Sequence, residues 1–378
     1  MAASLAVTRP AGRLLSLDVF RGGTVAAMVL VNNPGAWDAV YPPLRHADWH
    51  GWTPTDLVFP FFLFIVGVAI PLALGPRLVR GEARAALLGR IARRATVIFA
   101  LGLFLHAFPT FDLATIRIPG VLQRIAVCYL VTAALFVTTG WRVQAGVAAT
   151  ALLGYWAAMT LVPAPGFAAG DLSKEGNLAA FIDRAVLGPH IWRVGGVYDP
   201  EGLLSTIPAV ATTLAGLLAG QWLRAAGDPR RAALGFAAAG ALAAGAGLIW
   251  GVWFPINKPL WTSSYAVFTA GLALLGLAAC HWVVEVQGRR RWTPPFVALG
   301  MNALALFFLS TLVARILVVV KVPVDDGRSV ALQAAVFERV FAPWASPVNA
   351  SLAFALTTVL AWLLVMGILY RRGIRLTV

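Results

Sequence analysis

Charged residues are scarce in this sequence of 378 residues, and acidic ones are the scarcest. Only 12% of the residues are charged and 60% are hydrophobic, while 30 basic residues outnumber 16 acidic ones to give a net charge of +14. So little charge excludes an ordinary water-soluble globular protein. The positive balance does not predict nucleic-acid binding, since that would need a basic stripe on a soluble domain, which the sequence lacks. The composition predicts a polytopic membrane protein.

Cysteine is nearly absent, and so is a segment typical of a secretory leader. Cys128 and Cys280 both lie in apolar runs. There they serve most simply as small apolar side chains, so no disulfide framework is predicted. Residues 1–15 lack the uninterrupted apolar core of a cleavable signal peptide. We therefore expect the first helix to be retained.

Long apolar runs recur along the whole chain. About ten are long enough for a membrane-spanning helix, near residues 16–35, 55–76, 90–108, 120–138, 143–163, 203–223, 232–253, 263–284, 295–320 and 350–370. The sequence therefore predicts an all-α fold, a bundle of about ten transmembrane helices. One membrane domain would cover residues 16–370, between a basic arm at 1–15 and a tail at 371–378.

Arginine is distributed unevenly between the connections. Most arginines lie at the two ends of the chain and in alternate connections, namely 77–89, 139–142, 224–231 and 285–294. Positively charged connections remain on the cytoplasmic side of a membrane. This pattern predicts that both termini are cytoplasmic and that the loop containing His46 lies outside.

Two long outer connections, 164–202 and 321–349, contain short helical patterns at 178–187 and 329–341. Long ordered loops often act as lids over a site, although a solvated connection is an equally good interpretation.

The most distinctive segment is HADWHGWTPTDLVFPFFLFIVG at residues 46–67. It joins a polar, aromatic hook (residues 46–55) to an apolar helix that begins near Asp56. A carboxylate near the end of such a helix is costly unless it serves a partner or a ligand. A histidine such as His46 can accept a proton from a nucleophile, although loop histidines are more often merely solvated. The hook is a candidate active site at a membrane face.

The first predicted helix carries two charges and a terminal amide. Asp18 and Arg21 are three residues apart, so they can pair with each other or bind a ligand. Asn32 falls on the same helix face as Arg21, about 16 Å further along the axis. This face would suit a long ligand with an anionic head and a reactive tail.

Three further side chains need a partner or a ligand. Arg124 would lie about one turn inside the outer end of its helix, where Asp56 or Asp112 is its simplest partner. Asn302 can hydrogen-bond to a neighbouring helix. Trp261 lies near the outer boundary, where tryptophan anchors a protein in the interface but can also stack on a sugar.

Motifs along nearly the whole chain indicate a family. They are RLLSLDVFRG (13–22), VNNPG (31–35), the hook motif, RIPGVLQRIAVCY (117–129), YDPEGLLSTIPA (198–209), PINKPLWTSSY (255–265) and GMNAL (300–304). With them the chain resembles the heparan-alpha-glucosaminide N-acetyltransferase family. These multi-pass enzymes move an acetyl group from cytoplasmic acetyl-CoA to the amine of a terminal glucosamine across the membrane.

The resemblance implies an acetyl-CoA:amino-sugar N-acetyltransferase with acetyl-CoA as co-substrate and no metal. His46 takes the place of the family's catalytic histidine and Asn32 that of its active-site asparagine. If His46 acts as a base, we expect Asp56 or Asp48 to be the carboxylate that orients it. The short basic arm favours a bacterial-type relative in the inner membrane. Its expected partners are an exported amino sugar and membrane lipids, a homodimer is left open, and no nucleic acid is expected.

The chemistry of acetyl-CoA suggests further roles. Its phosphates cannot enter hydrocarbon, so a protein channel must hold them and extend the thioester outward. We assign cofactor contacts to Arg21, Asp18, Arg124 and Asn302. Acceptor contacts are assigned to polar residues of the outer motifs, namely Asp199, Glu201, Asn257, Lys258 and Trp261. Asn32 could donate to the developing oxyanion.

Other functions remain open on the sequence alone. A secondary transporter or a flippase for a sugar or lipid-linked sugar would also have about ten helices with intramembrane charges, and a scaffold subunit would use its polar residues only for packing. Within the enzyme hypothesis, direct transfer with His46 as general base competes with a ping-pong route through acetylated His46.

Overall fold

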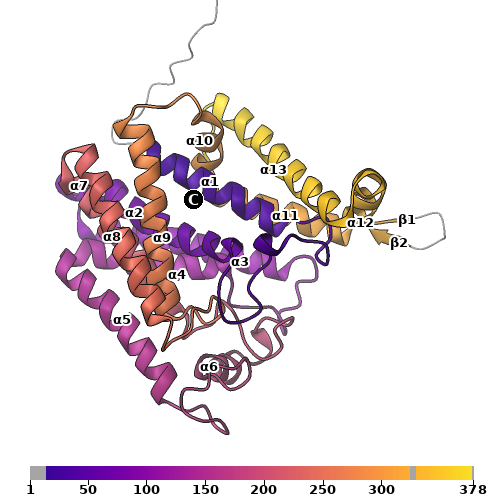
Figure 1. Ribbon diagram of the computed structural model, residues 1–378, viewed down its shortest axis with the longest axis horizontal. Helices are drawn as coiled ribbons and strands as arrows, with labels where there is room; N and C mark the ends of the chain where they lie inside the picture. Colours follow the sequence, from indigo (N-terminus) through magenta and orange to yellow (C-terminus); the bar gives the residue numbers. More distant parts are fainter. Residues whose placement is uncertain (1–13, 324–328, 377–378) are drawn as a thin grey trace, which may run out of the picture.

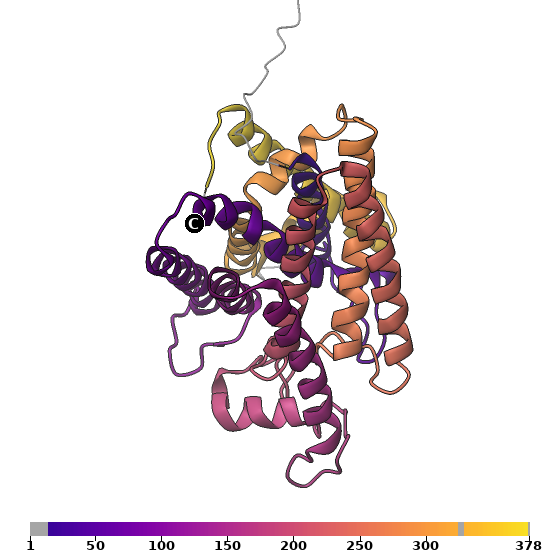
Figure 2. The same cartoon turned by 90° about the vertical axis from the view of Figure 1, so that its left-hand side faces the viewer.

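The computed structural model describes residues 14–323 and 329–376, and this part of the chain is almost entirely helical (Figures 1 and 2). The predicted all-α fold is confirmed. The long helices are α1 (Leu15–Asn32), α2 (Val58–Val79), α3 (Arg84–Ala107), α4 (Val121–Thr138), α5 (Trp141–Leu161), α7 (Thr206–Ala226), α8 (Pro229–Trp250), α9 (Ser263–His281), α11 (Ala303–Val319) and α13 (Pro347–Arg371).

Shorter elements complete the chain. They are the helices α6 (Leu178–Leu187), α10 (Pro294–Met301) and α12 (Leu332–Val336), the strands β1 (Lys321–Pro323) and β2 (Ser329–Ala331), 3-10 turns at Pro42–Leu44, Pro54–Leu57, Gly188–His190 and Ala342–Trp344, and π-helical turns at Trp282–Val286 and Phe337–Phe341. In both views α6 lies at one end of the bundle and α10 near the other (Figures 1 and 2).

Each of the ten predicted spans contains a long helix. Among the described residues, seven helices are long and apolar enough to cross a membrane, and the bent pair α10–α11 makes an eighth if it forms one span. The other two, α3 and α5, are long enough with 24 and 21 residues, but they are less apolar. The protein is thus an integral membrane protein. By length and composition alone, up to eight spans qualify among the described residues, compared with the ten predicted.

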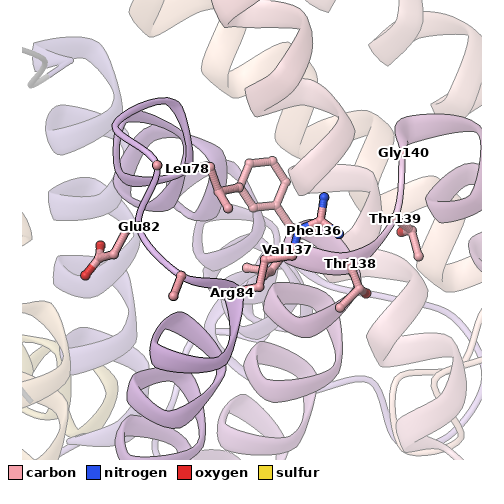
Figure 3. Close-up of a pocket in the computed structure, with 10 residues that line it drawn as sticks. Leu78, Glu82, Arg84, Phe136, Val137, Thr138, Thr139 and Gly140 are labelled. Atoms are coloured by element: carbon pink, nitrogen blue, oxygen red, sulfur yellow. The ribbon is translucent and has the colours of Figure 1, made fainter.

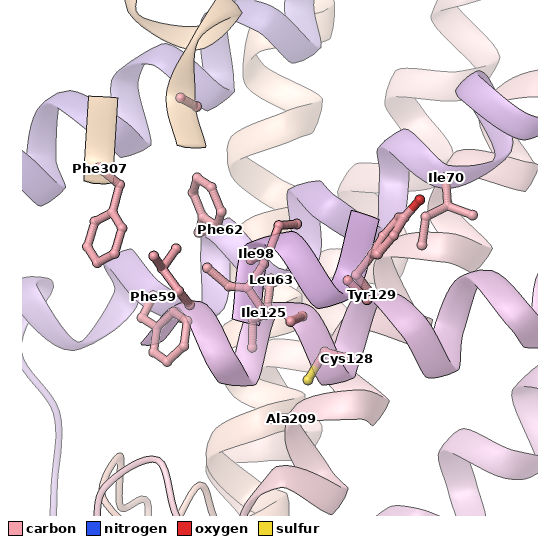
Figure 4. Close-up of a cluster of buried hydrophobic side chains, with 14 of the residues drawn as sticks. Phe59, Phe62, Leu63, Ile70, Ile98, Ile125, Cys128, Tyr129, Ala209 and Phe307 are labelled. Atoms are coloured by element: carbon pink, nitrogen blue, oxygen red, sulfur yellow. The ribbon is translucent and has the colours of Figure 1, made fainter. Parts of the chain in front are cut away.

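Close helix contacts depend on small residues, as in many membrane bundles. A Cβ atom on Gly67 of α2 would collide with the backbone of Thr213 in α7, and one on Gly216 of α7 would collide with that of Phe64 in α2. The main hydrophobic core includes side chains of α2, α3, α4, α7 and α11, among them Phe59, Ile98, Cys128, Ala209 and Phe307 (Figure 4). Cys128 and Cys280 are free thiols, as the apolar surroundings predicted.

The predicted single helix at 295–320 is wrong, because α10 and α11 meet at a 77° bend. The bend lies at Asn302, a residue without an obvious breaking signal. On the α10 side, Gly22 of α1 sits against the backbone of Phe296, and Gly300 sits against that of Asp18. The close contact between α1 and α10 thus occurs beside the bend, which the pattern of apolar residues did not predict.

The two long connections that were predicted to be outer match their predicted secondary structure in part. Helix α6 covers residues 178–187 as predicted. The pattern at 329–341 begins instead as strand β2, which pairs antiparallel with β1, and becomes helical only from Leu332. Most of the predicted basic arm (residues 1–13) and the last two residues of the predicted tail lie outside the described residues.

Candidate active site

The hook is held in place by the start of the helix that follows it. Thr53 and Asp56 form a reciprocal capping box: the Thr53 side chain accepts from the backbone N–H of Asp56, and the backbone N–H of Thr53 donates to Asp56 Oδ2 at 3.0 Å. The backbone N–H of Ala47 also donates to Oδ2, at 3.0 Å. One carboxylate oxygen therefore fixes both ends of the hook.

The other oxygen of Asp56 binds His46. The two side chains are 2.6 Å apart, Nδ1 to Oδ1, and since a carboxylate only accepts, Nδ1 carries the proton and donates. The Nε2 atom is then left with its lone pair. The Asp56 side chain is 1% exposed, whereas that of His46 is 51% exposed. This arrangement is a solvent-accessible base oriented by a buried carboxylate.

Lys258 completes this cluster from a distant part of the chain. Its Nζ atom lies 3.1 Å from His46 Nδ1, 3.2 Å from Nε2 and 3.7 Å from Asp56 Oδ1. Neighbouring Asn257 is fully buried and holds the loop against the hook, because its Nδ2 donates to the backbone oxygen of Trp49 at 2.9 Å. Asn257 thus shapes the site through the backbone.

A second charged cluster consists of Arg117, Asp199 and Glu201. The Arg117 guanidinium donates to both oxygens of Asp199, at 2.9 and 2.5 Å, and to Glu201 at 2.5 Å. Burial alone would lower the pKa of Arg117, but Glu201 and Asp199 raise it above its ordinary value. Burial alone would raise the pKa of Glu201, but the charges of Arg117, Arg124 and Lys258 hold it below its ordinary value. Glu201 therefore connects this cluster electrostatically to Lys258.

Arg117 was not among the predicted site residues. It is the only basic residue between α3 and α4 and is the first residue of the 117–129 motif. Its place in this motif could have indicated a functional role.

Arg124 and Trp261 are buried together rather than lining the surface. The Arg124 guanidinium lies 5.1 Å from the centre of the Trp261 ring, and its Nη2 donates to the backbone of Gly202 and to Ser205. The expected ion pair with Asp56 or Asp112 is wrong, since among the described residues Arg124 makes no such contact. Trp261 is 1% exposed and donates to Thr212 at 3.1 Å. Its ring is not open to a sugar in this conformation.

The structure places the predicted cofactor residues Asp18 and Arg21 on α1 and Asn302 at the bend between α10 and α11, and it places the predicted catalytic residue Asn32 at the end of α1. Arg21 pairs with Asp18 at 3.4 Å, as their spacing indicated. Asn32 is the exposed last residue of α1. Asn302 binds the chain near its C-terminus: its Oδ1 accepts from the N–H of Leu376 at 2.9 Å, and its Nδ2 donates to Ile374.

A cavity of about 630 Å³ lies between the C-terminal ends of α2 and α4 and the N-terminal ends of α3 and α5 (Figure 3). Its lining includes Leu78, Glu82, Arg84, Phe136 and Thr139, none of which was a predicted site residue. Since α2 starts near Asp56 and is 22 residues long, the cavity lies about 33 Å from the hook along that helix.

A further buried carboxylate, Asp183 of α6, neighbours the second cluster. It accepts from the backbone N–H of Leu203 at 2.8 Å. Burial raises its pKa to about 6, and the nearby charge of Asp199 adds to this effect. The protonated form is thus favoured by folding, so the free energy of unfolding falls as the pH rises from about 4 to about 6.

Replacing Asp183 by Asn should therefore stabilise the protein at pH 7.5 by about 2–3 kcal/mol, since about 1.4 kcal/mol corresponds to each pKa unit. The amide oxygen can still accept from Leu203. Below pH 4 the variant and the wild type should melt together. Thermal unfolding in detergent at both pH values checks this; equal melting at pH 7.5 would contradict it.

Comparison with known proteins identifies the family. The family model described as "Heparan-alpha-glucosaminide N-acetyltransferase, catalytic" matches residues 13–245. The chain belongs to this family. The matched range contains the His46–Asp56 pair and the Arg117 cluster, whereas the loop of Lys258 lies beyond it.

Curated relatives in the family have the same description. The chain is 31% identical to heparan-alpha-glucosaminide N-acetyltransferase of Mus musculus, over 79% of this chain and 53% of the relative. It is also 31% identical to the Homo sapiens protein of that name, over 78% and 52%. The chain thus spans about half the length of the curated relatives it matches. The resemblance seen in the motifs is confirmed.

Proposed function

We propose that this protein is a transmembrane acetyltransferase that moves an acetyl group from cytoplasmic acetyl-CoA to the amine of a glucosamine-type sugar on the outer face of a bacterial inner membrane. The observation that carries the proposal is the bond between exposed His46 and buried Asp56. A base whose Nε2 carries a lone pair is what an amine nucleophile needs, because the amine must lose a proton as it attacks.

The reaction balances with groups on this chain. The neutral sugar amine attacks the thioester carbonyl carbon, His46 Nε2 takes the amine's proton, and the C–S bond breaks to release CoA, whose sulfur receives this proton from the imidazolium. Asp56 keeps Nδ1 protonated and stabilises the imidazolium that forms. Lys258 places a positive charge beside the ring, where it can stabilise the oxyanion of the tetrahedral intermediate.

Direct transfer is preferred to a ping-pong route. An acetylated imidazole is labile in water, and the side chain of His46 is half exposed. A ternary complex avoids this exposed intermediate.

The test uses purified full-length protein in nanodiscs with labelled acetyl-CoA and glucosamine. N-acetylglucosamine should form at a rate that depends on both substrates. If the sugar instead crosses a vesicle membrane unaltered, the protein is a transporter or flippase. Absence of both product and transport would leave a scaffold role and overturn the proposal.

Arg21 is the proposed contact of the CoA phosphates. It is a partly exposed cation that Asp18 holds in place. Arg21→Ala should weaken acetyl-CoA binding about 10- to 100-fold, because a hydrogen bond to a charged group contributes about 1.5–3 kcal/mol. Arg21→Lys should restore only part of this, since the guanidinium fork is lost.

Isothermal titration calorimetry with acetyl-CoA measures both Arg21 variants. Asp18→Asn serves as the milder comparison, since it removes only the group that orients Arg21. Unchanged affinity in both Arg21 variants would show that the nucleotide binds elsewhere.

A further inference from the structure

Lys258 brings a primary amine within hydrogen-bond distance of the candidate base His46. Its Nζ is 3.1–3.2 Å from the two ring nitrogens of His46, within the distance over which a base removes a proton. The preceding residue, Asn257, is fixed by hydrogen bonds of its side chain to the backbone of Trp49 and of Leu260. The lysine amine is therefore positioned by the fold and does not sample the solvent freely.

The surroundings of Lys258 favour an amine that can react. Its side chain is only 17% exposed, and burial lowers its pKa even though Asp56 and Glu201 act in the opposite direction. A lower pKa increases the fraction of neutral amine, and only the neutral amine is a nucleophile.

We propose that Lys258 is itself an acetyl acceptor, so that the site acetylates its own lysine when no amino sugar is bound. The inference rests on the proposed function, since it uses the same donor and the same base. The neutral Nζ attacks the thioester carbonyl carbon, His46 takes one proton from nitrogen, and the C–S bond breaks to release CoA, whose sulfur receives that proton from His46. The products are Nε-acetyl-lysine and CoA, and no further reactant is needed.

This modification would limit the enzyme's own activity. Acetylation removes the positive charge beside His46 and leaves an amide in front of Nε2. A sugar amine competes with Lys258 for that position, so the acceptor substrate should protect the enzyme. Acetyl-CoA without acceptor should slowly inactivate it.

The composition of the chain provides its own controls. Among 30 basic residues only three are lysines, Lys174, Lys258 and Lys321, and arginine does not lose its proton under these conditions. Lys174 and Lys321 are exposed. They report the uncatalysed reaction of a lysine with acetyl-CoA in the same sample.

The experiment incubates full-length protein in nanodiscs with acetyl-CoA and follows the three lysines by peptide mass spectrometry. Lys258 should become acetylated at least about tenfold faster than the other two, since general-base help typically gives 10²–10⁴ and burial offsets part of it. His46→Ala should reduce Lys258 to the rate of the exposed lysines or below. Glucosamine should slow its modification.

A second measurement follows activity. After incubation with acetyl-CoA alone, wild type should lose activity in proportion to Lys258 acetylation. Lys258→Arg should retain its own starting activity, whatever that value is, because it has no amine to modify. Equal loss in wild type and Lys258→Arg would overturn the inference.

Failure of the inference and failure of the proposed function look different. Acetylated glucosamine with unmodified Lys258, or equal modification of all three lysines independent of His46, would overturn self-acetylation alone. If neither the sugar nor Lys258 receives acetyl above the background, both are wrong.

Discussion

His46→Ala should abolish acetyl transfer to the proposed amino-sugar acceptor, with an expected loss of about 10²–10⁴ in rate, while acetyl-CoA should remain bound. The loss follows because no other group with a free lone pair touches the same position in the described structure. Lys258, the nearest neighbour, lies against Asp56 and in its ammonium form has no lone pair with which to replace His46 as the base. Binding of acetyl-CoA should persist because the proposed phosphate contact, Arg21, lies in the N-terminal half of α1, whereas the hook follows the C-terminal end of that helix.

The matched control is His50→Ala, which removes the second histidine of the hook. His50 contacts Asn257 at 3.3 Å and not Asp56, so its loss should leave transfer within a few-fold of wild type. Initial rates with both substrates and calorimetry with acetyl-CoA separate the two steps. A His46→Ala enzyme with normal transfer, or one unable to bind acetyl-CoA, would contradict the assigned role.

The same protein distinguishes the two routes of transfer. Wild type is mixed with labelled acetyl-CoA without acceptor, quenched rapidly and examined for label on His46. Stoichiometric label that passes to added sugar would replace direct transfer by a covalent mechanism. Direct transfer predicts no such label.

Asp56→Asn should damage both catalysis and folding. The carboxylate accepts from Ala47, Thr53 and His46 through two oxygens, and an amide offers only one. Whichever way it turns, its NH₂ group faces a donor. Losing one partner of a buried charged network costs about 3–5 kcal/mol, and the misoriented imidazole should lower the rate nearly as much as His46→Ala does.

Asp48→Asn is the control for Asp56→Asn, because Asp48 lies in the same hook but is exposed. It should melt and react like wild type. Thermal unfolding in detergent and initial rates provide the comparison. If Asp48→Asn proved the more damaging of the two, the orienting carboxylate would have been misassigned.

The positions of the helices could be predicted because hydropathy is a local property. Each span sums the apolar surface of about 20 consecutive residues, so segments such as 121–138 and 206–226 are visible in the sequence without knowledge of their neighbours. The same reasoning missed the bend at Asn302, since the α1–α10 contact at Gly22 and Gly300 depends on a distant helix.

The candidate site divides in the same way. The sequence by itself determined that a membrane-embedded carboxylate follows a histidine-containing loop, and that Asp18 and Arg21 are within pairing distance, because these relations span only a few residues. Only the tertiary structure decided that Asp56 rather than Asp48 orients His46, that Arg117 neutralises Asp199 and Glu201, and that Trp261 is buried. Lys258 meets His46 across 212 residues of chain. Contacts of that separation depend on how the whole bundle packs, which no local pattern of charge or hydrophobicity encodes.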